Sequence, residues 1–275
     1  MAYGSTWNRN RQFVSRGTLG EIVGRIITVV NQKGGVGKTT TAVNLAAGLA
    51  AAERQTLLVD LDPQGNATTG LGVLKRELDT TIYHVLLDEI PVGKAVKETE
   101  LAYLSLIPAD IDLVGAEIEL VSVPDRERRL QSSLSAVKDQ YDYILVDCPP
   151  SLGLLTLNAL TSADSAIIPL QCEYYALEGL AQLLKTINLV RDRLNTALNV
   201  EGILLTMFDG RTSLASQVSG EVHRYFSGQI FSTVIPRNIR LTEAPSHGKP
   251  VILYELRSSG AVAYLELTKE VISHG

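Results

Sequence analysis

The sequence predicts an α/β fold in which a doubly wound, mostly parallel sheet carries helices on both faces. Short, continuous runs of Val, Ile and Leu recur along the chain, and longer amphipathic stretches separate them. Strands that are buried on both faces of a parallel sheet have this continuous apolar character. A glycine-rich turn follows the first apolar run, at a position where such sheets bind ligands.

The expected elements alternate along the chain, so the crossovers between strands should be right-handed. The expected strands are apolar runs that cover residues 25–31, 56–61, 143–147, 165–170 and 202–206. The expected helices have apolar residues on one face and cover residues 39–52, 125–139, 177–194, 213–226 and 261–272.

The chain divides into an N-terminal extension and one domain. Residues 1–24 are polar and rich in Gly, Ser and Arg without a sustained period, so we expect a disordered extension. No linker-like composition interrupts residues 25–275, which we expect to form a single domain. The chain has 275 residues, of which 45% are hydrophobic and 20% charged, and this composition is ordinary for a globular domain.

Charge, cysteine content and hydropathy exclude several classes of protein. The net charge of −5 argues against bulk nucleic-acid binding unless basic residues gather locally. Two isolated cysteines, Cys148 and Cys172, fit a reducing cytoplasm better than a disulfide scaffold. The chain has no run of about 18 apolar residues, so we expect a cytoplasmic protein without a membrane span.

The strongest functional motif is the turn of residues 31–40, with the sequence NQKGGVGKTT, between a strand and a helix. Its glycines allow backbone N–H groups to approach phosphate oxygens, and the following helix directs its positive end at them. Lys38 supplies a cation for the β- and γ-phosphates, and the Thr39 hydroxyl is placed to bind Mg²⁺. The expected nucleotide contacts are Lys33, Gly34, Gly35, Val36, Gly37, Lys38, Thr39 and Thr40.

Carboxylates follow two of the expected strands. Asp60 and Asp62 end the second strand in the segment DLDPQGN, and Asp147 ends the strand ILVD. The carboxyl edge of a parallel sheet is where α/β proteins place ligands, so these acids should lie beside the glycine-rich turn. An apolar strand that ends in aspartate is typical of a Walker B element, in which Asp147 binds Mg²⁺ through water.

These motifs together resemble the ParA/Soj partition ATPases of the ParA/MinD superfamily, which are deviant P-loop NTPases. KGGVGKTTT resembles the deviant Walker A motif of that group, in which Lys33 is an additional lysine. DLDPQGN resembles the same family, as do the segments of residues 171–180, 206–214 and 234–250, so the resemblance extends from about residue 25 to the C-terminus.

The resemblance implies a specific cycle for this chain. Lys33 would reach the nucleotide of a second subunit, so ATP and Mg²⁺ would hold a homodimer together. The position of Asp62 would orient the attacking water, and that of Asp60 would lie near the metal. Pro236 and Asn238 would hold the adenine base. A ParB-type centromere-binding partner, together with DNA, would stimulate slow hydrolysis, for which we find no activating arginine in cis.

By the same resemblance, Arg211 and Arg240 match positions that bind double-stranded DNA without sequence preference. The resemblance therefore implies association with the nucleoid. The basic residues of this half are also compatible with a scatter of solvated charges, and Asn238 with an ordinary turn residue.

Three other functions compete with this interpretation. A MinD-like regulator of the division site would need an amphipathic C-terminal helix, and the ending LELTKEVISHG is acidic and short. An iron–sulfur protein would need paired cysteines, which Cys148 and Cys172 do not form. A scaffold with a vestigial P-loop would not need Lys38, Thr39, Asp62 and Asp147 together.

Overall fold

The computed structural model describes residues 24–226 and 228–274, and these contain a seven-stranded sheet in the order β3-β4-β2-β5-β1-β6-β7. All neighbouring pairs are parallel except β3 with β4 at one edge. The strands are β1 (Arg25–Val29), β2 (Thr56–Asp60), β3 (Lys97–Glu98), β4 (Leu104–Ile107), β5 (Tyr143–Asp147), β6 (Ser165–Gln171) and β7 (Asn199–Thr206).

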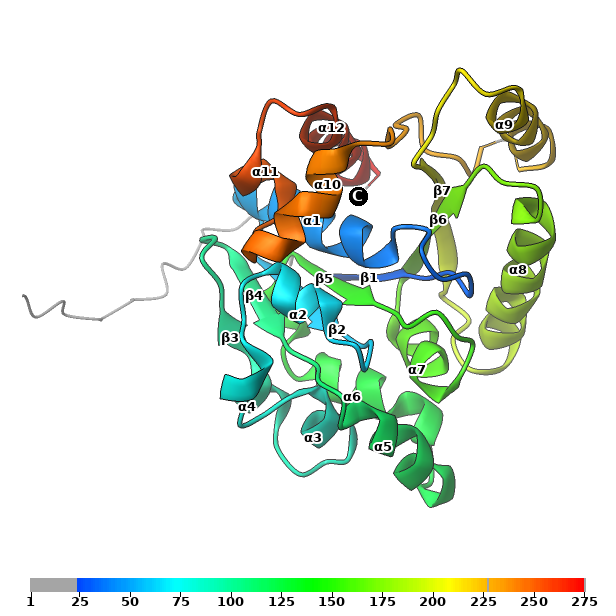
Figure 1. The fold of residues 1–275 in the computed structure, drawn as a ribbon. Helices are drawn as coiled ribbons and strands as arrows, with labels where there is room; N and C mark the ends of the chain where they lie inside the picture. The colour runs from blue at the N-terminus through cyan, green and yellow to red at the C-terminus, as the bar shows by residue number, and fades with distance from the viewer. Residues whose placement is uncertain (1–23, 227, 275) are drawn as a thin grey trace, which may run out of the picture.

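Helices of very different lengths connect the strands (Figure 1). The longer ones are α1 (Lys38–Ala51), α7 (Leu154–Ser162), α8 (Ala176–Arg193), α9 (Ser213–Tyr225) and α12 (Ser259–Ser273). The shorter α-helices are α2 (Asn66–Gly70), α3 (Ile82–Leu86), α4 (Val92–Ala95), α5 (Leu113–Glu119), α6 (Arg129–Ser135), α10 (Ile239–Glu243) and α11 (Val251–Tyr254). The 3-10 turns are η1 (Lys75–Glu77), η2 (Leu120–Ser122), η3 (Arg126–Arg128), η4 (Lys138–Gln140) and η5 (Ala244–His247).

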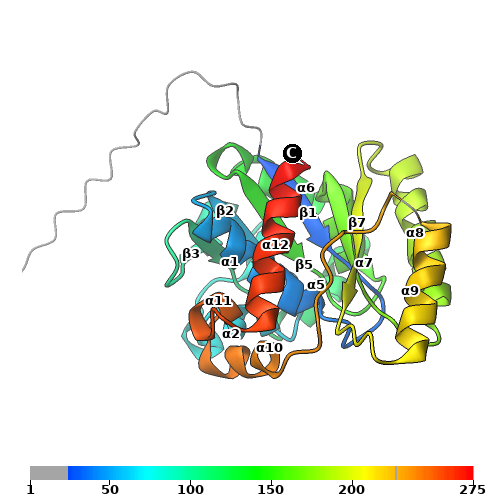
Figure 2. The same cartoon turned by 90° about the horizontal axis from the view of Figure 1, so that it is seen from above.

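The sheet separates two hydrophobic cores, because successive strand residues point to opposite faces. Ile27 and Val29 of β1 belong to the core under α1, α11 and α12, whereas Ile26 belongs to the core under α3, α5, α6 and α7. Figures 1 and 2 show α1 and α12 together on one side of the sheet, with α6 and α7 on the other. The expected doubly wound architecture is therefore confirmed.

The expected strands all occur within a few residues of their predicted limits, and so do four of the five expected helices. The predicted helix over residues 125–139 is wrong, because the chain forms η3, α6 and η4 there. Asp125 has a left-handed backbone with φ of 53°, and the Asn158 side chain accepts the Leu130 N–H (3.1 Å) and donates to the Arg126 carbonyl (2.8 Å). These contacts replace helical hydrogen bonds.

The predicted extension of residues 1–24 lies outside the described residues except for Gly24, which is buried. A Cβ atom at Gly24 would clash with the Lys138 and Tyr141 carbonyls, so the backbone at this position packs closely against the end of η4. None of the helices in the described part of the chain is long and apolar enough to cross a membrane.

Candidate nucleotide site

The glycine-rich turn links β1 to α1, and two of its glycines have backbone conformations that side chains disfavour. Gly35 has a φ of 75° and Gly37 a φ of 90°, both in the left-handed region. Gly37 is the N-cap of α1, and no side chain caps this end of the helix. The first N–H groups of α1 are therefore left to a ligand, which is the arrangement that binds phosphate.

Side chains from neighbouring strands hold the turn in place. The Asn31 amide donates to the Pro169 carbonyl on β6 (2.8 Å), while its oxygen accepts the Lys33 N–H (2.9 Å). The Thr206 hydroxyl at the end of β7 donates to the Val36 carbonyl (2.8 Å). Because these bonds come from β6 and β7, the turn is preorganised by the sheet itself.

Lys38 lies inside the turn and is only 6% exposed. Its ammonium donates to the Lys33 carbonyl (3.0 Å), so it is oriented back along the turn. Burial lowers the pKa of Lys38, and the nearby carboxylate of Asp147 is the largest influence that opposes the shift. A buried cation of this kind needs an anion beside it, which a phosphate group would supply.

A cavity of about 520 Å³ opens beside this turn and collects residues from six separate segments. Its phosphate end is formed by Gly34, Gly35, Gly37, Lys38, Thr39 and Thr40, together with Asp62, Gln64, Asn66 and Pro150. Its other end is formed by Thr206, Met207, Ile235, Pro236, Arg237, Asn238, Leu241, Thr242, Pro245 and Tyr264. Of the expected nucleotide contacts, Lys33 and Val36 are not among these lining residues.

Asp147 lies beneath the phosphate end and is fully buried. Neither of its carboxylate oxygens has a hydrogen-bond partner among the described residues. Burial raises the pKa of Asp147 well above its usual range and Asp60 on the adjacent strand adds to the rise, while the Thr39 hydroxyl and Lys38 oppose it. An unpaired buried carboxylate next to Thr39 is suited to a divalent cation and its water ligands, so Mg²⁺ fits this site.

Asp60 is also fully buried, but its oxygens are occupied. One accepts the N–H and the hydroxyl of Thr68, both at 2.7 Å, and the other accepts the Asp62 N–H (3.2 Å). Burial raises the pKa of Asp60, and the two Thr68 bonds oppose the rise. These hydrogen bonds connect Asp60 with the Asp62 loop, and the expectation that Asp60 lies near the metal stays a prediction.

Asp62 lines the cavity close to the phosphate end and is 6% exposed. Its side chain accepts the Gln64 N–H (2.9 Å), and Gly65 closes the turn with a φ of 53°. This turn leaves the second carboxylate oxygen of Asp62 available for a water molecule at the phosphate end.

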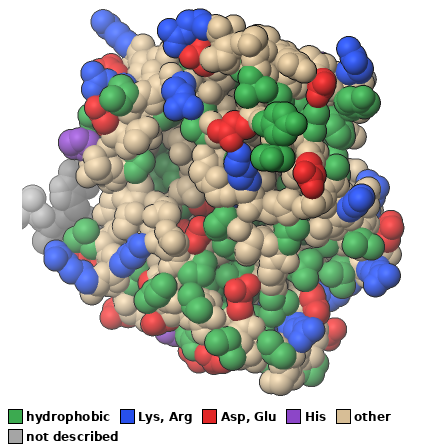
Figure 3. Space-filling model, turned by 45° about the vertical axis from the view of Figure 1, so that its right-hand side comes forward, with side chains coloured by type: hydrophobic (Ala, Val, Ile, Leu, Met, Phe, Trp, Pro, Cys, Tyr) green, Lys and Arg blue, Asp and Glu red, His purple; other side chains and the backbone are tan. Residues whose placement is uncertain are grey.

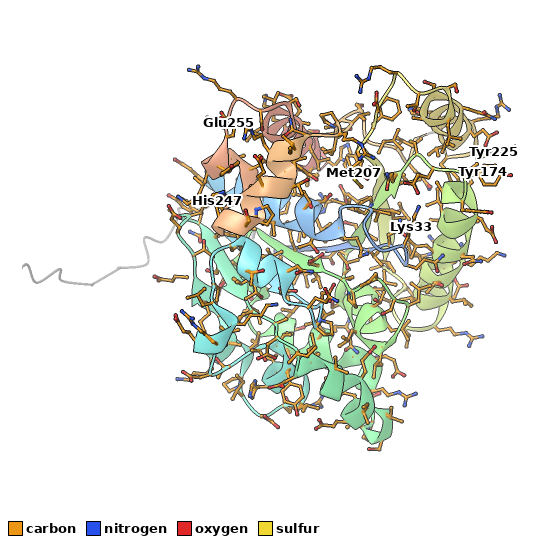
Figure 4. The ribbon with its side chains drawn as sticks, in the orientation of Figure 1. Lys33, Tyr174, Met207, Tyr225, His247 and Glu255 are labelled. Atoms are coloured by element: carbon orange, nitrogen blue, oxygen red, sulfur yellow. The ribbon has the colours of Figure 1, made fainter. Side chains whose placement is uncertain are left out.

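Lys33 points away from the cavity, toward the segment before α8, where it forms an ion pair with Glu173 (Figure 4). Both side chains are 45% exposed. A lysine that leaves its own cavity and stays at the surface can reach a second molecule placed against this face.

The far end of the cavity combines expected and unexpected residues. Asn238 lines it, its oxygen accepts the Arg240 N–H (2.9 Å) as the N-cap of α10, and its amide donates to Ser259 (2.7 Å), while its contact with adenine stays a prediction. Met207 has a φ of 48° and Arg237 lines the same wall. Both lie inside the recognised segments of residues 206–214 and 234–250 but were not among the predicted site residues, whereas Tyr264 comes from α12, where nothing in the sequence indicates a site.

The two expected DNA contacts lie outside the cavity and are paired with acids. Arg211 precedes α9, is 90% exposed and binds Asp209 (2.7 Å), while Arg240 of α10 binds Glu243 (2.7 Å). Figure 3 shows Lys and Arg side chains scattered over one face of the molecule rather than gathered in a stripe. Exposed ion pairs of this kind contribute little energy, so phosphate groups can compete for both arginines.

The chain is similar to several known proteins. Residues 24–200 match the model of a family described as an AAA domain. The chain is 59% identical to the sporulation initiation inhibitor protein Soj of Bacillus subtilis over 92% of this chain and all of that protein. It is also 59% identical to the chromosome partitioning protein ParA of Myxococcus xanthus, over 91% of this chain and 88% of that one.

Among solved structures, the chain is similar to the cobyrinic acid a,c-diamide synthase of Mycobacterium smegmatis with bound ADP and magnesium. The TM-score is 0.81 at 38% identity, over 91% of this chain and 95% of that one. The identity to Soj and ParA is higher over similar coverage, so the partition proteins are the better guide to activity.

Proposed function

Because the chain belongs to the family of ParA and Soj partition ATPases, we propose that it hydrolyses ATP in a cycle that attaches to DNA and releases it. The observation that carries this proposal is the unpaired, buried carboxylate of Asp147 beneath a preorganised phosphate turn. A cation and a phosphate group would satisfy this carboxylate and the free N–H groups of the turn, and a P-loop ATPase needs this arrangement.

In this proposal the triphosphate lies against the turn of residues 34–40, with Lys38 on the β- and γ-phosphates. Thr39 and Asp147 would hold Mg²⁺, which would supply positive charge beside the phosphates. The diamide synthase, which is 38% identical, contains ADP and magnesium in its crystal structure, and this supports both ligands. Pro236 and Asn238 border the adenine end, together with Met207.

Asp62 positions the attacking water, because it lines the phosphate end and has one free carboxylate oxygen. Hydrolysis by the isolated protein should be slow, since Lys38 is the only cation among the described residues that line this end of the cavity. Arg237 does line the cavity in cis, but it belongs to the segment of Pro236 and Asn238 at the opposite end. Acceleration is then left to a ParB-type partner, together with DNA, as in P-loop enzymes that are activated in trans.

The nucleotide also joins two copies of the chain in this proposal. Lys33 lies outside its own cavity, with an exposed acidic partner that it can exchange for the phosphates of a second copy. The dimer then holds two copies of Arg211 and Arg240 together, and a linked pair of weak DNA sites binds at high effective concentration. Such a dimer would reside on the nucleoid and leave it after hydrolysis.

Sedimentation of the protein with ATP, with ADP and without nucleotide, each with and without duplex DNA, tests the cycle. We expect a dimer that binds DNA only with ATP. The Lys33→Ala variant should bind ATP as a monomer and fail to dimerise, whereas a Lys185→Ala variant on the outer part of α8 should behave as the unchanged protein. Equal DNA binding in ATP and ADP would contradict the proposal.

A further inference from the structure

The helix α5 has two apolar faces, and only one of them is buried. Leu113 and Ala116 of α5 and Leu120 of η2 are fully buried and belong to the core beneath the sheet. Their spacing of three and four residues places them on one side of the helix, so this side fixes α5 to the domain.

The second face is an exposed stripe formed by Ile111, Val114, Ile118 and Val121, whose exposed fractions are 68%, 47%, 73% and 60%. These residues follow one another at intervals of three and four, so they share the outer side of the helix. Figure 1 shows α5 at the periphery of the fold. Val114 and Ile118 lie on α5, with Ile111 in the preceding turn and Val121 in η2, and such a concentration of exposed β-branched residues in one short segment is typical of an interaction site.

Acidic residues border this apolar stripe on both sides. The helical period places Glu117 along one border and Asp112, the N-cap of α5, with Glu119 along the other, while Asp110 lies just before the helix and accepts the Asp112 N–H (3.2 Å). Glu119 accepts a hydrogen bond from the Tyr83 hydroxyl (3.0 Å), and Asp112 is exposed. A segment that docks here meets an apolar line between two rows of negative charge.

The arginines that follow in the sequence do not neutralise these acids. Arg126 binds the Val121 carbonyl and Glu127, and Arg128 donates to the Leu194 carbonyl (2.8 Å). Arg129 pairs with Asp88 (3.0 Å). Among the described residues, these guanidinium groups bond to partners other than the acids beside the stripe, although Arg126 lies at the end of the stripe, at Val121.

Two contacts connect α5 with the nucleotide site. The Ala109 N–H, shortly before α5, donates to the Thr68 hydroxyl (3.0 Å), and Thr68 in turn binds Asp60, which holds the Asp62 N–H. Glu117 also lies against Gly153, in the loop that follows Asp147. A ligand that shifts or rigidifies α5 would therefore affect the loop that contains Asp62 and the loop that follows Asp147.

We propose that the apolar stripe of α5 and its acidic borders dock a short basic, amphipathic segment of a ParB-type partner, and that this docking stimulates hydrolysis. The inference rests on the proposed function and adds the surface through which stimulation acts. Charge complementarity selects this occupant. A second copy of the chain is a poorer match, because a two-fold contact would place the acidic borders of one stripe against those of the other.

The test uses the full chain, ATP, duplex DNA and a synthetic peptide with the basic segment of a ParB-type protein. Hydrolysis is measured against peptide concentration for the unchanged protein, Ile118→Ser and Asp112→Lys/Glu119→Lys. The matched controls are Val262→Ser, an exposed β-branched residue of α12, and Asp192→Lys, an exposed acid of α8. We expect both α5 variants to need at least about tenfold more peptide for half-maximal stimulation, as central interface residues do. The controls should not differ from the unchanged protein.

Sedimentation with ATP measures the oligomeric state of each variant and distinguishes the possible outcomes. The α5 variants should keep basal hydrolysis and ATP-dependent dimerisation, and the charge-reversed variant should lose the salt dependence of peptide stimulation. Loss of the dimer in Ile118→Ser would assign the stripe to a second copy and overturn the inference. Equal stimulation of all variants would also overturn it, while leaving the proposed function intact. Absence of stimulation in the unchanged protein would count against the proposed function itself.

Discussion

The phosphate turn of residues 31–40 and the segment of residues 66–140 differ in what holds their backbone in place. The turn depends on glycines at positions with positive φ and on the start of α1, all adjacent in the sequence. The later segment consists of short helices held by distant side chains, of which Thr68 and Asn158 are the clearest examples. A local motif therefore predicts the first region well and the second poorly.

The two regions also have different functions in our proposal. The first region binds the nucleotide, whereas the second contains Thr68, which supports the Asp62 loop through Asp60, and the apolar stripe of α5. Substitutions in the two regions should therefore differ in whether they change ATP affinity, stability and hydrolysis, or DNA binding alone.

The largest effect is expected from Lys38→Ala. The Lys38 ammonium is buried at the phosphate end, so its loss removes charge-assisted hydrogen bonds to the phosphates. At about 1.5–3 kcal/mol for such bonds, ATP affinity should fall by roughly 10- to 150-fold, as measured by calorimetric titration. Lys33→Ala is the control and should leave monomer affinity nearly unchanged. A similar loss in both variants would remove the distinction between the two lysines.

Thr68→Val should affect stability and hydrolysis together. The change leaves the Ala109 N–H without its buried partner and removes one of the hydrogen bonds to Asp60, which keeps the backbone N–H groups of residue 68 and Asp62. Unfolding free energy should decrease by about 2–3 kcal/mol, because buried polar groups lose hydrogen bonds that water cannot replace. Hydrolysis should fall more than ATP affinity, since the Asp62 loop loses its support.

The control is Thr69→Val, whose exposed hydroxyl makes only long hydrogen bonds within α2 and its preceding turn. It should be close to neutral in thermal unfolding. If Thr68→Val had the same small effect, the network from Asp60 to Ala109 would not stabilise the loop.

Asn158→Ala should weaken the second region without changing the first. Its side chain bonds Leu130 and Arg126 in the segment where a continuous helix was predicted. We expect a loss of about 1–3 kcal/mol in denaturant unfolding and unchanged ATP affinity. Asn188→Ala on the exposed side of α8 serves as the control. Weakened ATP binding in Asn158→Ala would show that the two regions are not independent.

The smallest effect on the protein itself is expected from Arg211→Ala and Arg240→Ala. Their ion pairs are exposed, so stability should change by no more than about 0.5 kcal/mol. The salt dependence of DNA binding should instead become shallower, by about 0.9 in logarithmic slope for each DNA phosphate that the variant no longer neutralises. Arg191→Ala on α8 should leave the slope unchanged in the same electrophoretic or fluorescence assay.

The sequence predicted the sheet, its helical layers and the position of the phosphate turn because each depends on neighbouring residues. It also identified Asp62, Asp147, Pro236 and Asn238, which the fold brings to one cavity or directly beneath it. It did not identify Tyr264, because only the packing of α12 against α1 brings that residue to the cavity. The sequence also did not predict that hydrogen bonds occupy the Asp60 oxygens, or that the expected helix of residues 125–139 is divided. Both depend on side chains, Thr68 and Asn158, that bond residues distant in the sequence.

The most direct test of the account is Asp62→Ala, examined for ATP affinity, ATP-dependent dimerisation and single-turnover release of phosphate. Asp62 lines the cavity, and among the described residues its side chain bonds only within its own turn. Its removal should therefore disturb the position of the attacking water and leave the rest of the site in place. The account predicts ATP affinity within about threefold of the unchanged protein, a dimer that persists, and phosphate release slowed by about 100-fold or more. Phosphate release at the original rate, or loss of ATP binding with it, would contradict the assignment of this cavity as a hydrolytic site built around Asp62.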